Sequence, residues 1–242
     1  MQILSQDSIL RKVPACLNPK QALFVDGIRH SAEIIELAYG RLVKVLTEIA
    51  IMPPEQQNVS AISASVFLDA WAIIDAIDRF RMLYQQMPGI SFPKPELCEP
   101  TFEDLTKPFR ALRNVADHLA QRADSVISKK GTALGVLSWI TLYEVNPPKI
   151  WLCTLRPGTV RVEPKFQGKF LETAVENQTD QITLQAGGFE GNISNFLPQV
   201  VKRVRHFEKQ LEVAFSNEDF DESLVASDVY MRQSYTLREI KS

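Results

Sequence analysis

The sequence predicts an α+β fold, in which a bundle of long helices carries an inserted antiparallel sheet. Apolar residues recur at helical spacing over 17–130. Residues 131–190 are rich in β-branched and aromatic residues separated by Gly and Pro turns, which is typical of short antiparallel strands. A helical pattern returns over 191–215, and we expect that helix to pack back on the bundle because its apolar face needs a large partner.

Composition and charge narrow the class of protein. The 242 residues are 45% hydrophobic and 23% charged, with a formal net charge of −2, so no broad attraction to nucleic acid or membrane is expected. Cys16, Cys98 and Cys153 lie far apart, which predicts neither a disulfide framework nor a zinc site. We expect a cytoplasmic chain without a membrane span, a metal or a cofactor.

Two long helices are expected first, after an irregular lead-in at residues 1–16. Asn18-Pro19 is a cap and first-turn pair, and the helical pattern then runs to about Met52 before Pro53-Pro54. The second helix is expected over about Val59–Met87. The first helix carries four polar residues at neighbouring positions: Asp26, Arg29, His30 and Glu33. They either lie near a functional site or form a solvated helix face, and the solvated face is the simpler interpretation.

The later half of the second helix carries a charged patch of Asp75, Asp78, Arg79 and Arg81. Asp75 and Arg79 stand four residues apart, which predicts an ion pair on the helix surface. A second hypothesis is that Asp75 or Asp78 orients a functional residue of the next helix across the bundle.

The third helix carries the chain's candidate chemistry. It follows a proline-rich loop over 88–108, with Thr106 as the expected cap and Pro108 in the first turn, and is expected to reach Ser128 or Lys130. Its apolar positions have helical spacing and predict one buried face: Phe109, Leu112, Ala116, Leu119, Ala123 and Val126.

The same helix carries the run Arg113-Asn114-x-x-x-His118, with His118 expected nearly opposite the apolar face and Arg113 at its flank. Asn114 is expected one turn before His118 on the same face, and Asp117 beside Arg113. A histidine transfers protons near neutral pH, and an arginine fork binds phosphate oxygens at two points. Together they suit metal-free cleavage of an RNA phosphodiester, although the same residues are ordinary on a solvated helix face.

This run, late in a set of long amphipathic helices, resembles the HEPN superfamily over roughly residues 17–130. The resemblance implies an all-helical domain whose active members are metal-independent endoribonucleases, often dimeric. It implies that Arg113 and His118 are the catalytic pair and Asn114 the polar residue beside the arginine. Independently of the resemblance, the charge pattern makes Asp75, Asp78 and Asp117 candidate supporting residues. Other members bind without activity, and the β-rich part after residue 131 departs from the helical pattern.

The remainder of the chain is expected to form the sheet, the last helix and a tail. Strands are expected over Leu134–Val145, Ile150–Leu155, Thr159–Val162 and Gln181–Ala186, with a further start at Phe170-Leu171 and a flexible loop at Gly187–Gly191.

The last helix, capped by Asn192 or Ser194, has a basic face that either contacts RNA phosphate or is simply solvated: Lys202, Arg203 and Arg205. Residues 216–228 contain five acidic and no basic residues, and 216–242 are expected to form a mobile acidic tail with a weak helix or strand near Val225–Tyr235 that could cover a basic surface.

Three hypotheses follow for function. The chain is a HEPN-like endoribonuclease, of toxin or phage-defence type with a protein antitoxin as a candidate partner. Alternatively it is a HEPN-like module that binds RNA or protein without chemistry, or an interaction protein in which the motif is incidental. A homodimer through the motif helix would bring two copies of His118 together, one as base and one as acid.

Overall fold

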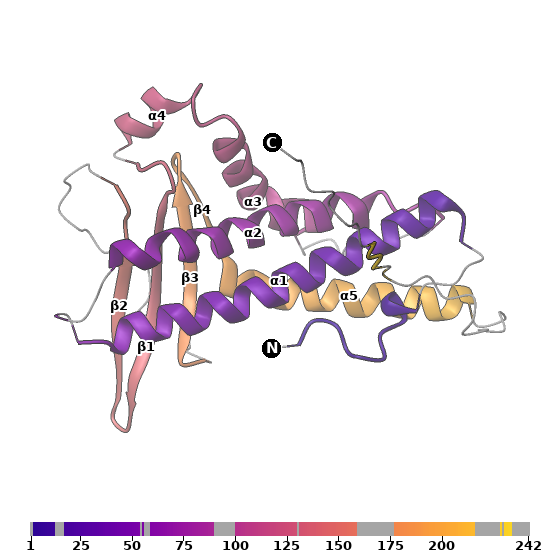
Figure 1. Cartoon of the computed structure of the whole chain (residues 1–242), viewed down its shortest axis with the longest axis horizontal. Coiled ribbons are helices and arrows are strands. Elements are labelled where there is room, and N and C mark those ends of the chain that lie inside the picture. Colours follow the sequence, from indigo (N-terminus) through magenta and orange to yellow (C-terminus); the bar gives the residue numbers. More distant parts are fainter. Residues whose placement is uncertain are drawn as a thin grey trace, which may run out of the picture.

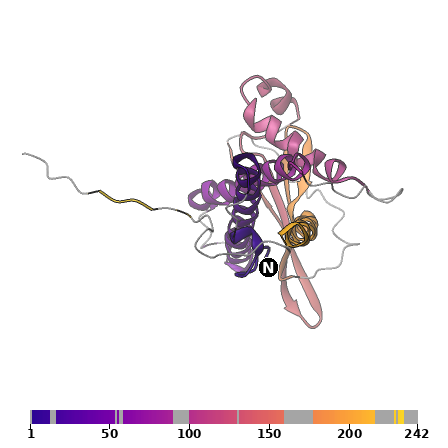
Figure 2. The same cartoon turned by 90° about the vertical axis from the view of Figure 1, so that its right-hand side faces the viewer.

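The computed structural model shows an α+β fold with helices packed on a four-stranded antiparallel sheet (Figure 1). The sheet has the spatial order β2-β1-β3-β4. Helices α1 and α2 lie side by side across one face of the sheet, and α5 runs away from its β4 side (Figures 1 and 2). The residues described are 2–12, 17–53, 55, 59–89, 100–129, 131–158, 177–215, 228 and 230–233.

The first two helices follow the sequence pattern closely. α1 spans Pro19–Ile51, and Asn18 caps it with a full capping box in which Asn18 and Gln21 exchange hydrogen bonds. α2 spans Val59–Gln85 and buries residues on most of its circumference. It is long and apolar enough to cross a membrane by length and composition, but the core helix of a soluble protein meets the same test.

The lead-in is irregular, as expected, but it belongs to the core. A short 3₁₀ helix, η1, spans Ile9–Arg11, and Ile3, Leu4 and Leu10 are at most 1% exposed. Glu36 of α1 accepts hydrogen bonds from the backbone N–H groups of Ile3 and Leu4, and buried Glu208 of α5 accepts from Ser8. The N-terminal segment is therefore held against both α1 and α5.

The sheet is built from two hairpins. β1 (Val136–Val145) pairs with β2 (Pro148–Leu155) on one side and with β3 (Thr179–Ala186) on the other. The expected loop at Gly187–Gly191 is wrong: Gly187 and Gly188, both with positive φ, make a two-residue turn into β4 (Phe189–Asn192). The expected strands at Thr159–Val162 and Phe170-Leu171 lie outside the described residues.

A bulge joins the sheet to the last helix. On β1 the pairing passes from Ser138 to Ile140 while β3 passes from Thr183 to Asp180, so β3 carries an extra residue there. Gln181 lies in this bulge with a φ of 54°, and its amide N–H donates to Asp180 Oδ1. Its side chain bonds Asn192 and Asn195, which fixes the start of α5.

Helix α5 spans Ile193–Phe215 and packs on the other helices through aromatic rings. Phe196 lies 4.5 Å from Phe109 of α3 between ring centroids, and Phe207 lies 6.2 Å from Tyr84 of α2. Asn192 accepts a hydrogen bond from the Asn195 N–H at its first turn, in the manner of a cap. The helix thus returns to the bundle from the sheet.

Candidate functional site

The motif helix, α3, spans Phe102–Asp117, so both expected ends are wrong. Thr101, not Thr106, caps it, in a capping box with Asp104. Pro108 is inside the helix, and Thr106 is buried with its hydroxyl bonded to backbone carbonyls one turn earlier. The predicted start of α3 was wrong because a proline usually marks the first turn of a helix. Here the capping box of Thr101 and Asp104, which lies earlier in the sequence, determines where the helix begins.

The end of α3 lies before the histidine. His118 is the C-cap, with φ −119° and ψ 30°, and residues 118–122 form turns that lead to the short helix α4 (Ala123–Ser128). His118 and Asn114 are both exposed, but they do not share one helix face as expected. Ala116 is exposed too, and Val115 takes the buried position predicted for it.

The buried face of α3 rests on the β3–β4 hairpin. Phe109, Leu112 and Val115 are at most 3% exposed. A Cβ on Gly187 would lie 2.7 Å from a methyl group of Val115, and one on Gly191 would lie 3.1 Å from Leu112 and Phe109. These two glycines let the motif helix approach the hairpin closely, which fixes the direction in which its other face points.

Arg113 is held by three carboxylates from two helices. Its Nη1 donates to Asp78 Oδ2 at 2.8 Å, and its Nε lies 3.2 Å from Asp75 Oδ1 and 3.7 Å from Asp117 Oδ2. The hydrogen bond that Arg113 donates to Asp78, with the nearby charges of Asp75 and Asp117, raises the pKa of Arg113 above its ordinary value despite partial burial. The structure therefore brings Arg113 together with Asp75, Asp78 and Asp117.

Asp78 is the buried centre of this cluster. Its side chain is 6% exposed and also bonds Arg81, whose side chain is 10% exposed, at 2.8–2.9 Å. Asp75 in turn pairs with Arg79 at 2.6 Å, as the four-residue spacing predicts. Six charged residues thus balance three to three: Asp75, Asp78, Asp117, Arg79, Arg81 and Arg113.

This arrangement leaves limited but definite chemistry. Among the described residues, Arg113 Nη2 has no hydrogen-bond partner, and the Arg113 side chain is 31% exposed. The His118 imidazole likewise has no hydrogen bond or ion pair within the described ranges. One outward donor edge and one solvent-facing imidazole can bind and protonate an anionic ligand, but one copy supplies only one imidazole.

The basic residues expected on α5 are not all available for a phosphate. Lys202 is exposed. Arg203 is half-buried with its guanidinium carbon 4.3 Å from the centroid of the Phe102 ring, a cation–π contact. Arg205 forms an ion pair with Glu208 at 2.9 Å. The solvated-face interpretation therefore fits Lys202 best, while the arginines hold the packing of α5.

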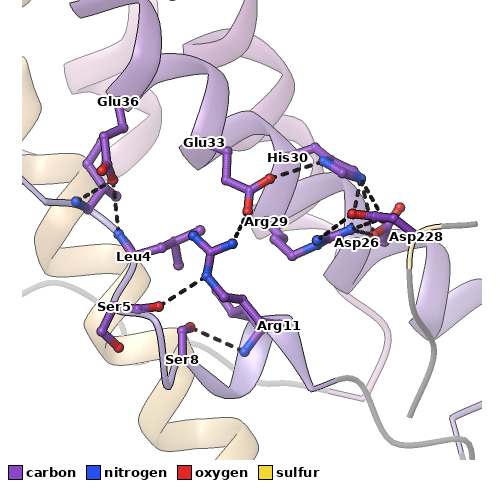
Figure 3. A network of polar contacts seen from close by, with 12 residues as sticks. Leu4, Ser5, Ser8, Arg11, Asp26, Arg29, His30, Glu33, Glu36 and Asp228 are labelled. Atoms are coloured by element: carbon purple, nitrogen blue, oxygen red, sulfur yellow. Dashed lines mark hydrogen bonds and ion pairs between the residues drawn. The ribbon is translucent and has the colours of Figure 1, made fainter. Parts of the chain in front are cut away.

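A second polar cluster lies on α1, where the sequence placed Asp26, Arg29, His30 and Glu33 (Figure 3). Glu33 bonds Arg11 of η1 at 2.5 Å and lies 3.2 Å from His30 Nδ1. Arg29 Nη2 lies 2.8 Å from both Asp26 Oδ1 and Asp228 Oδ1. The participation of Asp228 was missed at the sequence level, because only its place in an acidic run hinted at a basic partner.

This cluster also contains the geometry of a metal site, with ligand atoms of Asp26, His30 and Asp228 within 4.8 Å of one another. The Arg29 guanidinium bonds both carboxylates, however, and already neutralises them. A cation would have to displace that arginine, so the donor set does not fit a metal ion.

Two other features have little capacity for chemistry. The pocket lined by Ile3, Glu36, Tyr39, Gly40 and Leu197 has a volume of about 30 Å³, which suits a water molecule and not a metabolite. Burial raises the pKa of the Cys153 thiol to about 11, so it is protonated at neutral pH and a poor nucleophile.

No family model, curated protein or solved structure matches this chain. The case for any function therefore depends on the residues and their geometry.

Proposed function

We propose that two copies of this chain form a HEPN-like, metal-independent endoribonuclease, with Arg113 and His118 from each copy in one composite site. The observation that carries the proposal is the arrangement at the end of α3. Arg113 is fixed by carboxylates of α2, and its Nη2 has no hydrogen-bond partner within the part of the chain that the structure describes, while His118 lies in the following turn with its side chain exposed.

The chemistry follows the 2′-hydroxyl route. His118 of one copy takes the proton of the 2′-hydroxyl, and the oxygen attacks the adjacent phosphorus. The Arg113 Nη2 edge binds the charged phosphorane, and His118 of the second copy protonates the leaving 5′-oxygen. The products are a 2′,3′-cyclic phosphate and a 5′-hydroxyl, and the two imidazoles finish with exchanged protonation states.

A cleavage assay tests this proposal. We expect the wild-type protein to cleave single-stranded RNA in the presence of EDTA, and His118→Ala to lose about 10²-fold or more of the rate, which is the usual contribution of one acid–base group. Arg113→Ala should lose a comparable factor, whereas Arg110→Ala, an exposed arginine on the same helix, should not. Light scattering must show a dimer in solution. A monomer, or equal cleavage by His118→Ala, would end this proposal.

The second candidate is a HEPN-like module that binds RNA or protein without chemistry. The specific observation in its favour is the crowding of Arg113 by negative charge, since Nε and Nη1 both face carboxylates and Asp117 lies beside them. An approaching phosphate would meet that repulsion. RNA binding that Arg113→Ala abolishes, without any cleavage by the wild-type protein, would select this function.

A further inference from the structure

The charged cluster that holds Arg113 supplies no net charge to attract RNA. Its six charged residues balance three to three, and each arginine among them has a carboxylate partner: Arg79, Arg81 and Arg113. The remaining edge of Arg113 can therefore orient a phosphate better than it can attract one. Attraction of RNA depends on cations that the protein does not itself neutralise, so the motif needs such a cation beside it.

Arg122 is a cation of this kind, and it lies next to His118. Residues 118–122 form the turns that join α3 to α4 at the outer end of the molecule (Figure 1). In these turns the backbone N–H of Arg122 donates to the His118 carbonyl at 3.0 Å and to the Leu119 carbonyl at 3.2 Å. A bond to the carbonyl four residues earlier closes one turn of helical type, in which the first and last residues are neighbours. The backbone thus keeps Arg122 beside the candidate catalytic imidazole.

The guanidinium of Arg122 is available to a ligand. Arg122 is exposed, and its side chain has no hydrogen bond or ion pair with any residue in the described ranges. Two acidic residues are close in sequence, but neither neutralises it. Asp117 lies 3.7 Å from Arg113 Nε, and Asp124 follows by two positions, which in a helical turn is the opposite side. Unlike Arg113, Arg122 therefore offers its whole fork.

Two-fold symmetry places one copy of Arg122 beside each imidazole of the proposed composite site. The scissile phosphate lies between the two copies of His118, so the RNA strand passes one Arg122 on each side of the cleaved bond. An arginine fork binds a phosphate through two parallel hydrogen bonds. The arrangement therefore suits one phosphate before the scissile phosphate and one after it.

We propose that Arg122 is a phosphate-binding residue that selects single-stranded RNA with a phosphate on each side of the cleaved bond. With unphosphorylated ends, the shortest such substrate is a tetranucleotide, and a dinucleotide lacks both flanking phosphates. The inference rests on the proposed function for the position of the scissile phosphate. The contact between Arg122 and RNA does not itself require cleavage.

Binding is measured with a fluorescent 12-nucleotide oligouridylate on His118→Ala, the variant expected to leave RNA intact. Adding Arg122→Gln should raise the dissociation constant about five- to ten-fold at low salt. The slope of log K against log salt should fall by about 1.4, because each phosphate contact on a single strand contributes about 0.7 and a dimer loses two. Arg110→Gln, which makes the same charge change at an exposed arginine of α3, is the matched control and should leave the slope unchanged.

Cleavage kinetics separate a binding role from a structural one. On the 12-nucleotide substrate, Arg122→Gln in the otherwise wild-type protein should raise KM about five- to ten-fold without changing kcat, because the lost contact is the same in the ground and transition states. Arg122→Lys should recover part of the loss, since an ammonium still binds phosphate as a point charge. On the dinucleotide UpU, Arg122→Gln should match the wild type, since no flanking phosphate is present.

Three results would overturn the inference. Unchanged binding would mean that Arg122 does not contact RNA, and an equal loss with Arg110→Gln would mean diffuse attraction without a defined contact. An equal loss on UpU would mean damage to the turn that holds His118. RNA binding that depends on Arg122, without cleavage by the wild-type protein, would end the endoribonuclease proposal and leave this inference standing. Cleavage that needs His118 but is indifferent to Arg122 would do the reverse.

Discussion

Arg113 and Arg29 are both arginines held by carboxylates from two segments of the chain, yet their partners differ in burial. The main partner of Arg113 is Asp78, which is 6% exposed in its side chain and belongs to the helical core. The long-range partner of Arg29 is Asp228, which is 73% exposed. A buried partner makes an arginine part of the architecture, whereas an exposed partner leaves it open to exchange.

The difference has a consequence for function. Release of Arg113 would remove one of the two arginines that pair with buried Asp78, so Arg113 offers a ligand only its remaining edge. Arg29 can release the exposed Asp228 carboxylate into water at small cost, while Asp26 and His30 keep their contacts with its Nη2. Rigid positioning suits transition-state binding, and exchange suits regulation.

The largest effect is expected at the buried partner. Asp78→Ala removes the buried carboxylate that pairs with both Arg81, which is 8% exposed, and Arg113. Breaking a buried ion pair from one side typically costs about 3–5 kcal/mol in the free energy of unfolding. Urea denaturation followed by circular dichroism measures it. Asp75→Ala, which removes a half-exposed partner of the same arginine, is the control and should cost below about 1 kcal/mol.

The arginines themselves give a smaller, paired effect. Arg113→Ala should lower the free energy of unfolding by about 1–3 kcal/mol, because its charged hydrogen bond to Asp78 is largely shielded from water. Arg29→Ala should lower it by less than about 1 kcal/mol, because both of its carboxylate partners are substantially exposed. Equal losses in urea denaturation would show that partner burial does not separate the two sites.

Features with local causes could be predicted from the sequence, and α1 is the clearest case. Its cap, its first-turn proline and its apolar spacing all lie within the helix, and the predicted Asn18 to Met52 is close to the observed Pro19–Ile51. The Asp75–Arg79 pair is of the same kind, since four residues bring the two side chains together on any helix.

The end of the motif helix could not be predicted in this way. Apolar residues continue at helical spacing through Leu119, Ala123 and Val126, and no glycine or proline occurs between Asp117 and Lys130. Val126 is indeed buried, but on the separate helix α4 after an intervening turn. The apolar spacing therefore continues across the turns that interrupt the helix. For that reason the sequence pattern wrongly predicted that His118 lies on a helix face.

The contacts of the candidate sites also differ in whether the sequence could predict them. That Asp75 or Asp78 could meet Arg113 was a hypothesis from the bundle, and the structure places both against it. The contact of Asp228 with Arg29 joins residues 199 positions apart. Only charge composition indicated such a contact, because loop closure over that distance leaves no periodic trace.

The smallest expected effect is in the capping box of α3, where the side chains of Asp104 and Lys107 are 44% and 68% exposed. Hydrogen bonds from Lys107 and Thr101 lower the pKa of Asp104 from 3.8 to about 2. Because the folded-state value is the lower one, the box stabilises the fold fully above the unfolded pKa, and this stabilisation is lost as the pH falls from about 4 to about 2. Thermal unfolding of wild type and Asp104→Asn should therefore differ slightly at pH 6 and converge near pH 2. A difference that persists at pH 2 would mean that the negative charge of Asp104 does not stabilise α3. The capping box would then stabilise the helix through the geometry of its hydrogen bonds.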